Sequence, residues 1–294
     1  MACDDTDGVM SPLDRNMPES LRVKITMVAE TIMSVIMLSG KVALITGASS
    51  GIGAATAEYF AKEGIAGLCI TGRNEEALVE TSLKCSVHIA LENVLTMTGD
   101  VTDEDFCKNL VEQTIAKFQS LHVLVNCAGI LTTGKFESTH LAVYDNVMNI
   151  NARSIVALTQ FAIPHLKKHP GKASIVNVSS VNGIRSFANV GPYCMSKAAL
   201  DMFTQCLALE LAPDVRVNSV NPGVIQTEVH KRAGMTDEAY SDFLKHSQTT
   251  HALGRPGQPD EVANVIAFLA SDQASFMTGN ITPIDGGRHA MCPR

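Results

Sequence analysis

The fold is decided by residues 42–53, VALITGASSGIG. The run 42–46 predicts a strand, a glycine-rich turn follows it, and a helical pattern begins immediately after the turn. Glycines at 47, 51 and 53 let the backbone turn tightly and approach a pyrophosphate, and the N-terminus of the next helix offers unpaired N–H groups. Such a turn, between the first strand and the first helix of an alternating chain, predicts a dinucleotide site.

The same letters permit a second interpretation. Residues 47–51 match G-x-S-x-G, the nucleophile elbow of α/β-hydrolases, with Ser49 as the nucleophile. That elbow normally follows several strands, whereas only an unpatterned N-terminal segment precedes it here. The hydrolase is therefore the less favoured alternative.

Short β-branched runs alternate with helical stretches from Lys41 onward. This alternation predicts an α/β fold with a parallel sheet covered by helices on both faces. The expected strands are 42–46, 68–71, 94–98, 121–125, 174–178, 215–220 and 281–284, and the expected helices lie near 52–63, 74–85, 103–118, 141–168, 193–212 and 259–271.

One region interrupts the alternation. Residues 223–258 show no clear periodicity and contain Gly234, Gly254, Pro256 and Gly257. Irregular segments of this length are uncommon in a compact domain and usually have a function, so the region is interpreted as a functional lid. Its part 224–254 is expected to select the substrate.

The first 38 residues differ from the rest and are expected to be an N-terminal extension to a domain spanning 39–294. Residues 1–20 are acidic and rich in turn formers, which predicts a disordered tail. Residues 25–38 are apolar but too short and too interrupted to cross a membrane. They fit a short amphipathic helix or an extension from an upstream start, and neither a secretory nor a mitochondrial signal.

Composition excludes several classes of function. The chain of 294 residues is 46% hydrophobic, carries a net charge of −7 and has no Trp. An acidic chain with few aromatic residues is not expected to bind nucleic acid. Its eight cysteines contain no C-x-x-C pair, which indicates reduced thiols in an intracellular protein. We expect a cytoplasmic location, with a mitochondrial one as the alternative. His165 and His169 are interpreted as a solvated helix end, and no metal site is expected.

The end of the second strand bears on the choice of cofactor. An acidic residue that binds the ribose 2′-hydroxyl of NAD is expected about 20 residues after the glycine turn. Gly72 and Arg73 stand there instead. A guanidinium can pair bidentately with a 2′-phosphate, so NADP (NADPH) is favoured over NAD. In the alternative, Arg73 is a solvated charge at a helix start and NAD is used.

Two residues four apart at a helix start predict the reacting groups. Tyr193 and Lys197 lie on one helical face, where an ammonium is expected to lower the pKa of the phenol. Ser180 precedes them at the end of the fifth strand, the sheet edge at which ligands bind in open α/β sheets. Its hydroxyl can donate a hydrogen bond to a carbonyl oxygen.

Taken together, these motifs resemble the short-chain dehydrogenase/reductase family over residues 40–288. The resemblance rests on TGxxxGxG at 46–53, NCAG at 126–129, NIN at 149–151, NVSS at 177–180, Tyr193 with Lys197, NPG at 221–223 with Thr227, and DGG at 285–287. It implies one Rossmann-like domain with a doubly wound, seven-stranded parallel sheet. It also implies a homodimer or homotetramer that uses the helices 141–168 and 198–212.

The resemblance also assigns roles. Tyr193 would be the general acid/base, Lys197 would lower its pKa and bind the nicotinamide ribose, and Ser180 would orient the carbonyl. Asn151 would hold a water in a proton relay, with Asn149 as the alternative. The residues implied for the cofactor are Gly47, Ser49, Ser50, Gly51, Ile52, Gly53, Arg73, Asp100, Val101, Asn126, Ala128, Gly129, Tyr193, Lys197, Pro222, Gly223 and Thr227.

The implied activity is NADP(H)-dependent interconversion of a carbonyl and a secondary alcohol on a small molecule. The general pattern, including the Gly254-Arg255-Pro256 run before the last helix, resembles 3-oxoacyl-[acyl-carrier-protein] reductases and their animal relatives. Two alternatives stay open. One is an NAD(H)-dependent steroid, retinoid or sugar alcohol dehydrogenase. The other is a cofactor-binding sensor or scaffold with little turnover.

Overall fold

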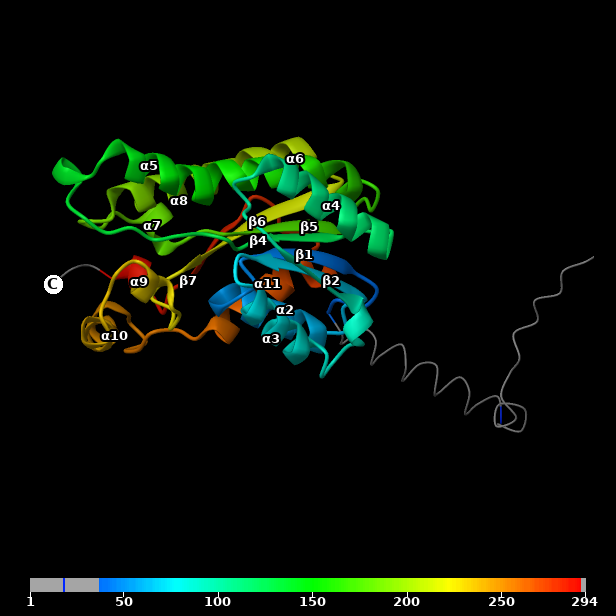
Figure 1. Ribbon diagram of the computed structural model, residues 1–294, viewed down its shortest axis with the longest axis horizontal. Coiled ribbons are helices and arrows are strands. Elements are labelled where there is room, and N and C mark those ends of the chain that lie inside the picture. The colour runs from blue at the N-terminus through cyan, green and yellow to red at the C-terminus, as the bar shows by residue number, and fades with distance from the viewer. Residues whose placement is uncertain (1–17, 19–36, 292–294) are drawn as a thin grey trace, which may run out of the picture. The chain divides into compact units, whose positions relative to one another are not determined.

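A seven-stranded parallel sheet forms the centre of the computed structural model, which describes Pro18 and residues 37–291. Its order is β3-β2-β1-β4-β5-β6-β7, so the first three strands are added toward one edge of the sheet and the remaining strands, from β4 on, toward the other (Figure 1). The expected doubly wound α/β fold is confirmed. The strands are β1 (Val42–Thr46), β2 (Gly67–Gly72), β3 (Val94–Thr98), β4 (Val123–Asn126), β5 (Ala173–Val178), β6 (Val215–Pro222) and β7 (Ile281–Ile284).

Helices cover both faces of this sheet, as Figure 1 shows. On one face lie α2 (Gly51–Lys62), α3 (Glu75–Cys85) and α11 (Pro259–Ala270). On the other lie α4 (Glu104–Phe118), α6 (Ser154–Leu166) and α8 (Gly191–Leu211).

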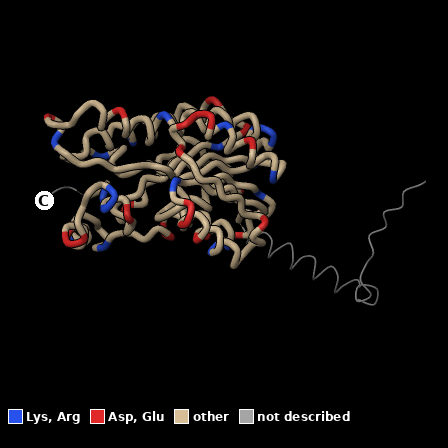
Figure 2. Tube along the Cα trace, viewed as in Figure 1, with Lys and Arg blue, Asp and Glu red and all other residues tan. Residues whose placement is uncertain are grey.

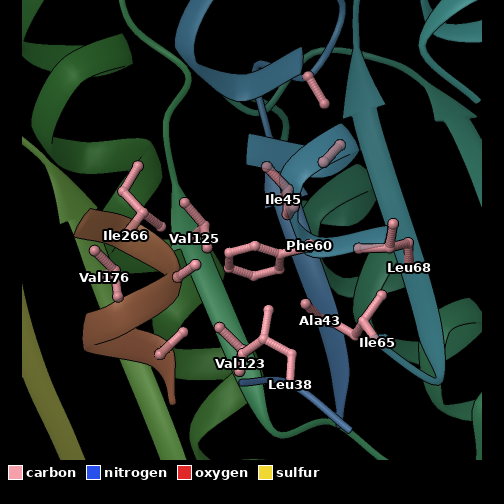
Figure 3. Packing of buried hydrophobic residues seen from close by; sticks show 14 of the residues in the cluster. Leu38, Ala43, Ile45, Phe60, Ile65, Leu68, Val123, Val125, Val176 and Ile266 are labelled. Carbon is pink, nitrogen blue, oxygen red and sulfur yellow. The ribbon is translucent and has the colours of Figure 1, made fainter. Parts of the chain in front are cut away.

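Each strand divides its side chains between the two layers because successive residues point to opposite faces. Ala43 and Ile45 of β1 join the apolar cluster under α2, whereas Leu44 joins the cluster under α4 and α6. Phe60 of α2 lies at the centre of the first cluster, fully buried among strand residues (Figure 3). Packing on both faces therefore holds the sheet, and with it the carboxyl ends of the strands, in a fixed position.

The expected helix 141–168 is divided. It begins as α5 (Leu141–Met148), passes through a π-helical turn at Asn149–Arg153 and continues as α6. A π turn adds one residue to the helical repeat and often accompanies a functional site. The apolar pattern continues through the turn, so the sequence alone gives no sign of the extra residue.

The expected lid contains helices rather than a structureless loop. These are the short α9 (Val229–Arg232) and the longer α10 (Asp237–Thr250). Thr236 caps α10 by accepting a hydrogen bond from the N–H of Ala239 at 3.2 Å. The helix is mostly polar, with a short apolar face of partly buried Tyr240, Phe243 and Leu244 beside buried Ser247, and the sequence interpretation missed it.

The N-terminal expectations, a disordered tail at 1–20 and an amphipathic helix at 25–38, lie almost entirely outside the described residues. Within the described part, Leu38 is fully buried and its N–H bonds to the carbonyl of Glu63, so it belongs to the core of the domain. No described helix is long and apolar enough to span a membrane. Lys and Arg are interspersed with Asp and Glu along the outer helices and loops (Figure 2).

Candidate functional site

A cavity of about 510 Å³ opens at the carboxyl ends of the strands, where the order of the sheet reverses. It is also bordered by α9 and α10. Sequence reasoning selected many of the residues that line it: Gly47, Ser49, Ser50, Gly51, Ile52, Arg73, Asp100, Val101, Ala128, Gly129, Ser180, Tyr193, Lys197, Pro222, Gly223 and Thr227. Three selected residues, Gly53, Asn126 and Asn151, do not line it.

The glycine turn has a shape that larger residues would disturb. Gly47 has φ +68°, and a Cβ there would lie 2.9 Å from the backbone of Ala128. Gly51 has φ +57°, and a Cβ there would lie 3.1 Å from Thr227 Cγ2. Gly53 is instead packed against the carbonyl of Gly47, which brings α2 close to the turn. The glycine backbone of the turn therefore forms a groove at the edge of the cavity, and a side chain at either position would crowd Ala128 or Thr227.

The N-terminus of α2 offers hydrogen-bond donors to this groove. Ser50 occupies the position before the helix, and its side chain caps none of the first N–H groups. Unpaired N–H groups and the helix dipole both favour an anion at such a place. The arrangement fits the pyrophosphate of a dinucleotide.

Asn126 does not face the cavity, contrary to expectation. Its side chain is buried within the sheet and donates to Asn177 Oδ1 at 2.9 Å and to Thr159 Oγ1 at 3.2 Å. The loop after β4 is held instead by Thr46, whose hydroxyl accepts the N–H groups of Cys127 and Ala128, each at 3.0 Å. The asparagine therefore ties strands together beneath the site.

The far end of the cavity carries one guanidinium and one carboxylate. Arg73 is exposed there beside Gly72, and Asp100 lies across from it on the loop after β3. The N–H of Thr102 donates to Asp100 at 2.9 Å, and its hydroxyl donates at 2.8 Å. These bonds, and secondarily Arg73, lower the pKa of Asp100. Asp100 therefore stays ionised, and its carboxylate accepts hydrogen bonds from Thr102 in its own loop.

Ser180, Tyr193 and Lys197 meet at the opposite end. Ser180 lies two residues after β5, immediately before the short helix α7 (Val181–Ile184), and accepts the N–H of Asn182 at 3.1 Å. Lys197 lies one turn after Tyr193 on α8, with its Nζ 5.8 Å from the centre of the tyrosine ring. That Nζ donates to the carbonyl of Val178 at 2.8 Å, and the side chain is otherwise buried. The structure thus places in one cavity the three residues that the sequence motifs grouped.

The protonation of this group differs from the expectation. Burial raises the pKa of Tyr193 to about 12, and the smaller effect of a hydrogen bond with Ser180 opposes it. Burial also lowers the pKa of Lys197 to about 8, although Cys127 and Asp201 oppose this shift. The net shift of the Tyr193 pKa is upward because desolvation outweighs the opposing hydrogen bond. Tyr193 is therefore a protonated phenol at neutral pH.

Asn151 is oriented away from the cavity. Its Oδ1 accepts the N–H of Ile130 at 2.8 Å, and its Nδ2 donates to the carbonyl of Ile130 at 2.8 Å and to Ser196 Oγ at 3.1 Å. The residue sits in the π turn, and its neighbour Ile150 lines the cavity instead. The fully bonded side chain joins the loop after β4 to α8.

Sequence reasoning missed two supporting groups. Asp201 is buried one turn after Lys197 and accepts two hydrogen bonds from Asn221 Nδ2, at 3.1 and 3.0 Å. Asn221 Nδ2 also lies 2.9 Å from the carbonyl of Ser180, to which it donates. The four-residue spacing from Lys197 to Asp201 is a signal that could have identified this carboxylate. His251, whose Nε2 accepts the N–H of Val224, had no such signal.

Other chemistries find no support among residues 37–291. No group of three His, Cys, Asp or Glu side chains is arranged to hold a metal ion in this part of the chain. The turn carrying Ser49 follows the first strand of the sheet, at its reversal point, and no described histidine is hydrogen-bonded to Ser49. A nucleophile elbow would need such a base.

Known proteins resemble this chain over most of its length. A family model described as enoyl-(acyl carrier protein) reductase matches residues 47–289. The chain is 39% identical over 255 residues to the 3-oxoacyl-[acyl-carrier-protein] reductase FabG of Thermotoga maritima, covering 85% of this chain and 98% of the relative. It is 37% identical over 251 residues to the 2,5-dichloro-2,5-cyclohexadiene-1,4-diol dehydrogenase LinX of Sphingobium indicum, covering 85% and 96%. A short-chain dehydrogenase/reductase of unknown function from Caenorhabditis elegans, solved with cofactor, matches with a TM-score of 0.81 at 35% identity, covering 87% of this chain and 97% of that one.

Proposed function

The chain belongs to the short-chain dehydrogenase/reductase family of NAD(P)-dependent enzymes acting on CH–OH groups, and from this premise we propose NADP(H)-dependent interconversion of a carbonyl and a secondary alcohol. One observation carries the proposal. A single cavity joins the glycine turn and Arg73 at one end to Ser180, Tyr193 and Lys197 at the other.

The residues present fit a dinucleotide. A Cβ at Gly47 or Gly51 would crowd Ala128 or Thr227, and the N-terminus of α2 beside this groove has free donors. These groups would hold the pyrophosphate, while Asp100 and Val101 would border the adenine and Pro222, Gly223 and Thr227 the nicotinamide. A nicotinamide dinucleotide, when bound, supplies the hydride.

Arg73 supports the choice of NADPH. Its guanidinium has no hydrogen-bond or ion-pair partner among the described residues, and Gly72 beside it leaves no carboxylate to repel a phosphate. A 2′-phosphate would accept from the guanidinium, whereas a 2′-hydroxyl would find no acidic partner at Gly72.

Residues of the protein would supply the proton that the carbonyl oxygen takes up. As negative charge develops on the carbonyl oxygen, the Oη of Tyr193 donates its proton to that oxygen. Ser180 Oγ donates a second hydrogen bond and stabilises the same charge. Asp201 and Asn221 act as positioning residues, because their bonds hold the backbone carbonyl of Ser180. Asn151 positions the loop that carries Gly129.

The names of the relatives suggest which substrates to test first. The 3-oxoacyl group in the name of the Thermotoga relative is the first class we propose to test, ahead of steroid, retinoid and sugar alcohols. The proposed partner of the chain is a second copy of itself, in a homodimer or homotetramer. Exposed apolar side chains on α8 support this, since Met195, Met202 and Leu209 repeat every seven residues along one face.

We propose a reducing compartment, cytoplasmic or mitochondrial. Cys69, Cys85 and Cys107 are buried, unbridged thiols. Burial raises the pKa of all three, so they stay protonated and unreactive.

The test is steady-state kinetics of the purified full chain with a panel of carbonyl compounds and each of NADPH and NADH. The proposal requires cofactor oxidation that depends on the carbonyl compound and is faster with NADPH. Tight NADPH binding without turnover on any carbonyl would instead identify a sensor or scaffold.

A further inference from the structure

The arginines divide into two groups. Seven lie in the described residues, and four of them have partners: Arg153 with Glu104, Arg255 with Glu261, Arg185 with the carbonyl of Met291, and Arg216 with the carbonyls of Leu269 and Ser271. The other three, Arg73, Arg232 and Arg288, have no hydrogen-bond or ion-pair partner within that part of the chain. All three line the cavity.

Arg73 lies at the adenosine end and is accounted for by the proposed cofactor. Arg288 and Arg232 lie at the other end, with Tyr193. Arg288 begins a short 3₁₀ turn (η5, Arg288–Ala290) after β7, and Arg232 ends α9. Neither guanidinium has a role in the chemistry described so far.

Arg288 is held in place by its surroundings. Its N–H bonds to the carbonyl of Asp285 at 3.0 Å. Its guanidinium carbon lies 4.6 Å from the centre of the Phe187 ring, which also lines the cavity. A guanidinium stacked on an aromatic face keeps its N–H donors free in its own plane. Those donors have no acceptor among the described residues.

The nearest compensating charge is already engaged. The carboxylate of Asp285 accepts the N–H of Gly287 at 3.1 Å, the N–H of His289 at 2.6 Å and the ring of His289 at 3.0 Å. It lies more than 4.0 Å from the Arg288 guanidinium. Burial lowers the pKa of Arg288, and Asp285 opposes this only in part. The charge is thus half-buried and incompletely compensated, a costly arrangement unless a ligand completes it.

The rest of this end of the cavity is apolar or neutral. Phe187, Val190, Met235 and Phe243 provide apolar surface. His230 packs on Phe243 with ring centres 4.4 Å apart, and burial lowers its pKa to about 4, so it is neutral. The one carboxylate that lines this end, Glu228, is exposed and lies 3.9 Å from Lys231.

We propose that Arg288 binds an oxyanion, a carboxylate or a phosphate, on the carbonyl substrate, and that Arg232 at the rim assists it. This inference rests on the proposed function and names the substrate class: a carbonyl compound with an apolar body and an anionic group. The arginine fork matches a two-oxygen acceptor, and the apolar wall accommodates the carbon chain between the anion and the carbonyl.

The experiment compares matched pairs of substrates. The probes are aliphatic oxo acids whose carbonyl lies two to five bonds from the carboxylate, each beside its methyl ester, and one oxo phosphate beside its neutral alcohol. For the best pair, we expect the wild type to favour the anion. In Arg288→Met the ratio of kcat/KM for the anion over its neutral partner should fall by about tenfold or more, the fold-change typical of a lost charged hydrogen bond. Arg288→Lys should restore part of that ratio. The matched control Arg153→Met, which removes an exposed arginine paired with Glu104 outside the cavity lining, should leave it unchanged.

A second measurement needs no variant. A saturated carboxylate such as hexanoate should inhibit wild-type turnover competitively with the carbonyl compound, and hexanamide should inhibit at least about tenfold less. Equal ratios in wild type and Arg288→Met, or equal inhibition by the acid and the amide, would overturn the anion site. If neutral carbonyls are still reduced, the proposed function survives that result. If no carbonyl compound is reduced at all, the proposed function itself fails.

Discussion

His251 holds the backbone of Val224 from below the cavity: its Nε2 accepts the N–H of Val224 at 3.1 Å. The other ring nitrogen, Nδ1, lies 2.8 Å from the carbonyl of Ser247, which can only accept. Nδ1 therefore carries the hydrogen and the ring is neutral. Burial, the largest effect, lowers the pKa of His251 and favours this form. One imidazole thus joins α10 to the Pro222–Thr227 segment that borders the cavity.

Removing this imidazole should loosen the nicotinamide end of the site. In His251→Ala, the buried N–H of Val224 loses its acceptor, and we expect the free energy of unfolding to fall by about 1–3 kcal/mol. The KM for the dinucleotide should rise several-fold. His251→Gln can accept and donate in the same places and should recover most of both losses. Urea unfolding and steady-state kinetics measure them, and equal behaviour of the two variants would remove the positioning role.

Tyr193→Phe should abolish turnover while sparing the cofactor. The phenol supplies the proton, and general acid catalysis is worth about 10²- to 10⁴-fold in rate. We expect kcat to fall by at least that factor, while the Kd for NADPH, measured by fluorescence, stays within a few-fold of wild type. A variant that keeps its turnover would show that another group donates the proton.

Arg73→Ala should change the choice of cofactor. We expect kcat/KM for NADPH to fall by about 10- to 150-fold, the range for a lost charged hydrogen bond, and the value for NADH to change little. Measuring both cofactors with one carbonyl compound checks this. A wild type that already prefers NADH would make Arg73 a solvated surface charge.

Gly72→Asp is the complementary change. A Cβ at residue 72 would lie 2.9 Å from Ser49 Oγ, so the serine hydroxyl must rotate away. The new carboxylate would accept from a 2′-hydroxyl and repel a 2′-phosphate, which should move the preference toward NADH by at least about tenfold. Thermal unfolding of the variant separates this shift from a loss of folded protein.

Acid should weaken the fold through His122. Its Nδ1 accepts the N–H of Val42 at 3.1 Å, and burial, with smaller effects of His169 and nearby lysines, lowers its pKa to about 4. The folded pKa lies below the unfolded value of about 6.5, so the stabilisation is complete above that pH and is lost as pH falls toward 4. Urea unfolding at pH 7 and 4.5 should show that the free energy of unfolding falls less in His122→Gln than in the wild type. An identical fall in both proteins would contradict this.

Leu209→Glu should dissociate the proposed oligomer. Leu209 is 82% exposed on α8, so the substitution should not disturb the core. Leu83→Glu on α3, where the leucine is 53% exposed, is the matched control on another face. Analytical ultracentrifugation should show monomers only for Leu209→Glu. Unchanged association in both would place the contact elsewhere.

The sequence was sufficient for the sheet because buried parallel strands appear as continuous apolar runs. The expected strands, such as 42–46 and 281–284, match β1 and β7. Helix α10 escaped detection because its apolar face is short, with Tyr240, Phe243 and Leu244 set among polar residues and glycine and proline on either side in the sequence. Its signal was the capping residue Thr236 followed by Asp237 and Glu238.

The site was predicted where motifs combine residue type with position, as at Tyr193 and Lys197. The sequence does not show in which direction a side chain points. Asn126 and Asn151 were therefore expected near the cofactor, whereas in the structure their side chains form hydrogen bonds that join neighbouring elements. Arg288 was missed because only the folded chain brings the end of β7 to the cavity beside Phe187.

Helix α10 touches the body lightly, with Ser247 as its one buried residue and a hydrogen bond from Tyr240 Oη to the carbonyl of Thr227 at 3.0 Å. The reacting side chains, by contrast, stand directly after β5 and on α8, and α8 packs against the sheet through a buried apolar cluster. The residues of α10 that border the cavity can therefore be substituted without displacing the reacting side chains. A graft that replaces residues 228–250 with the corresponding segment of a relative would bring a new specificity to an unaltered reaction centre.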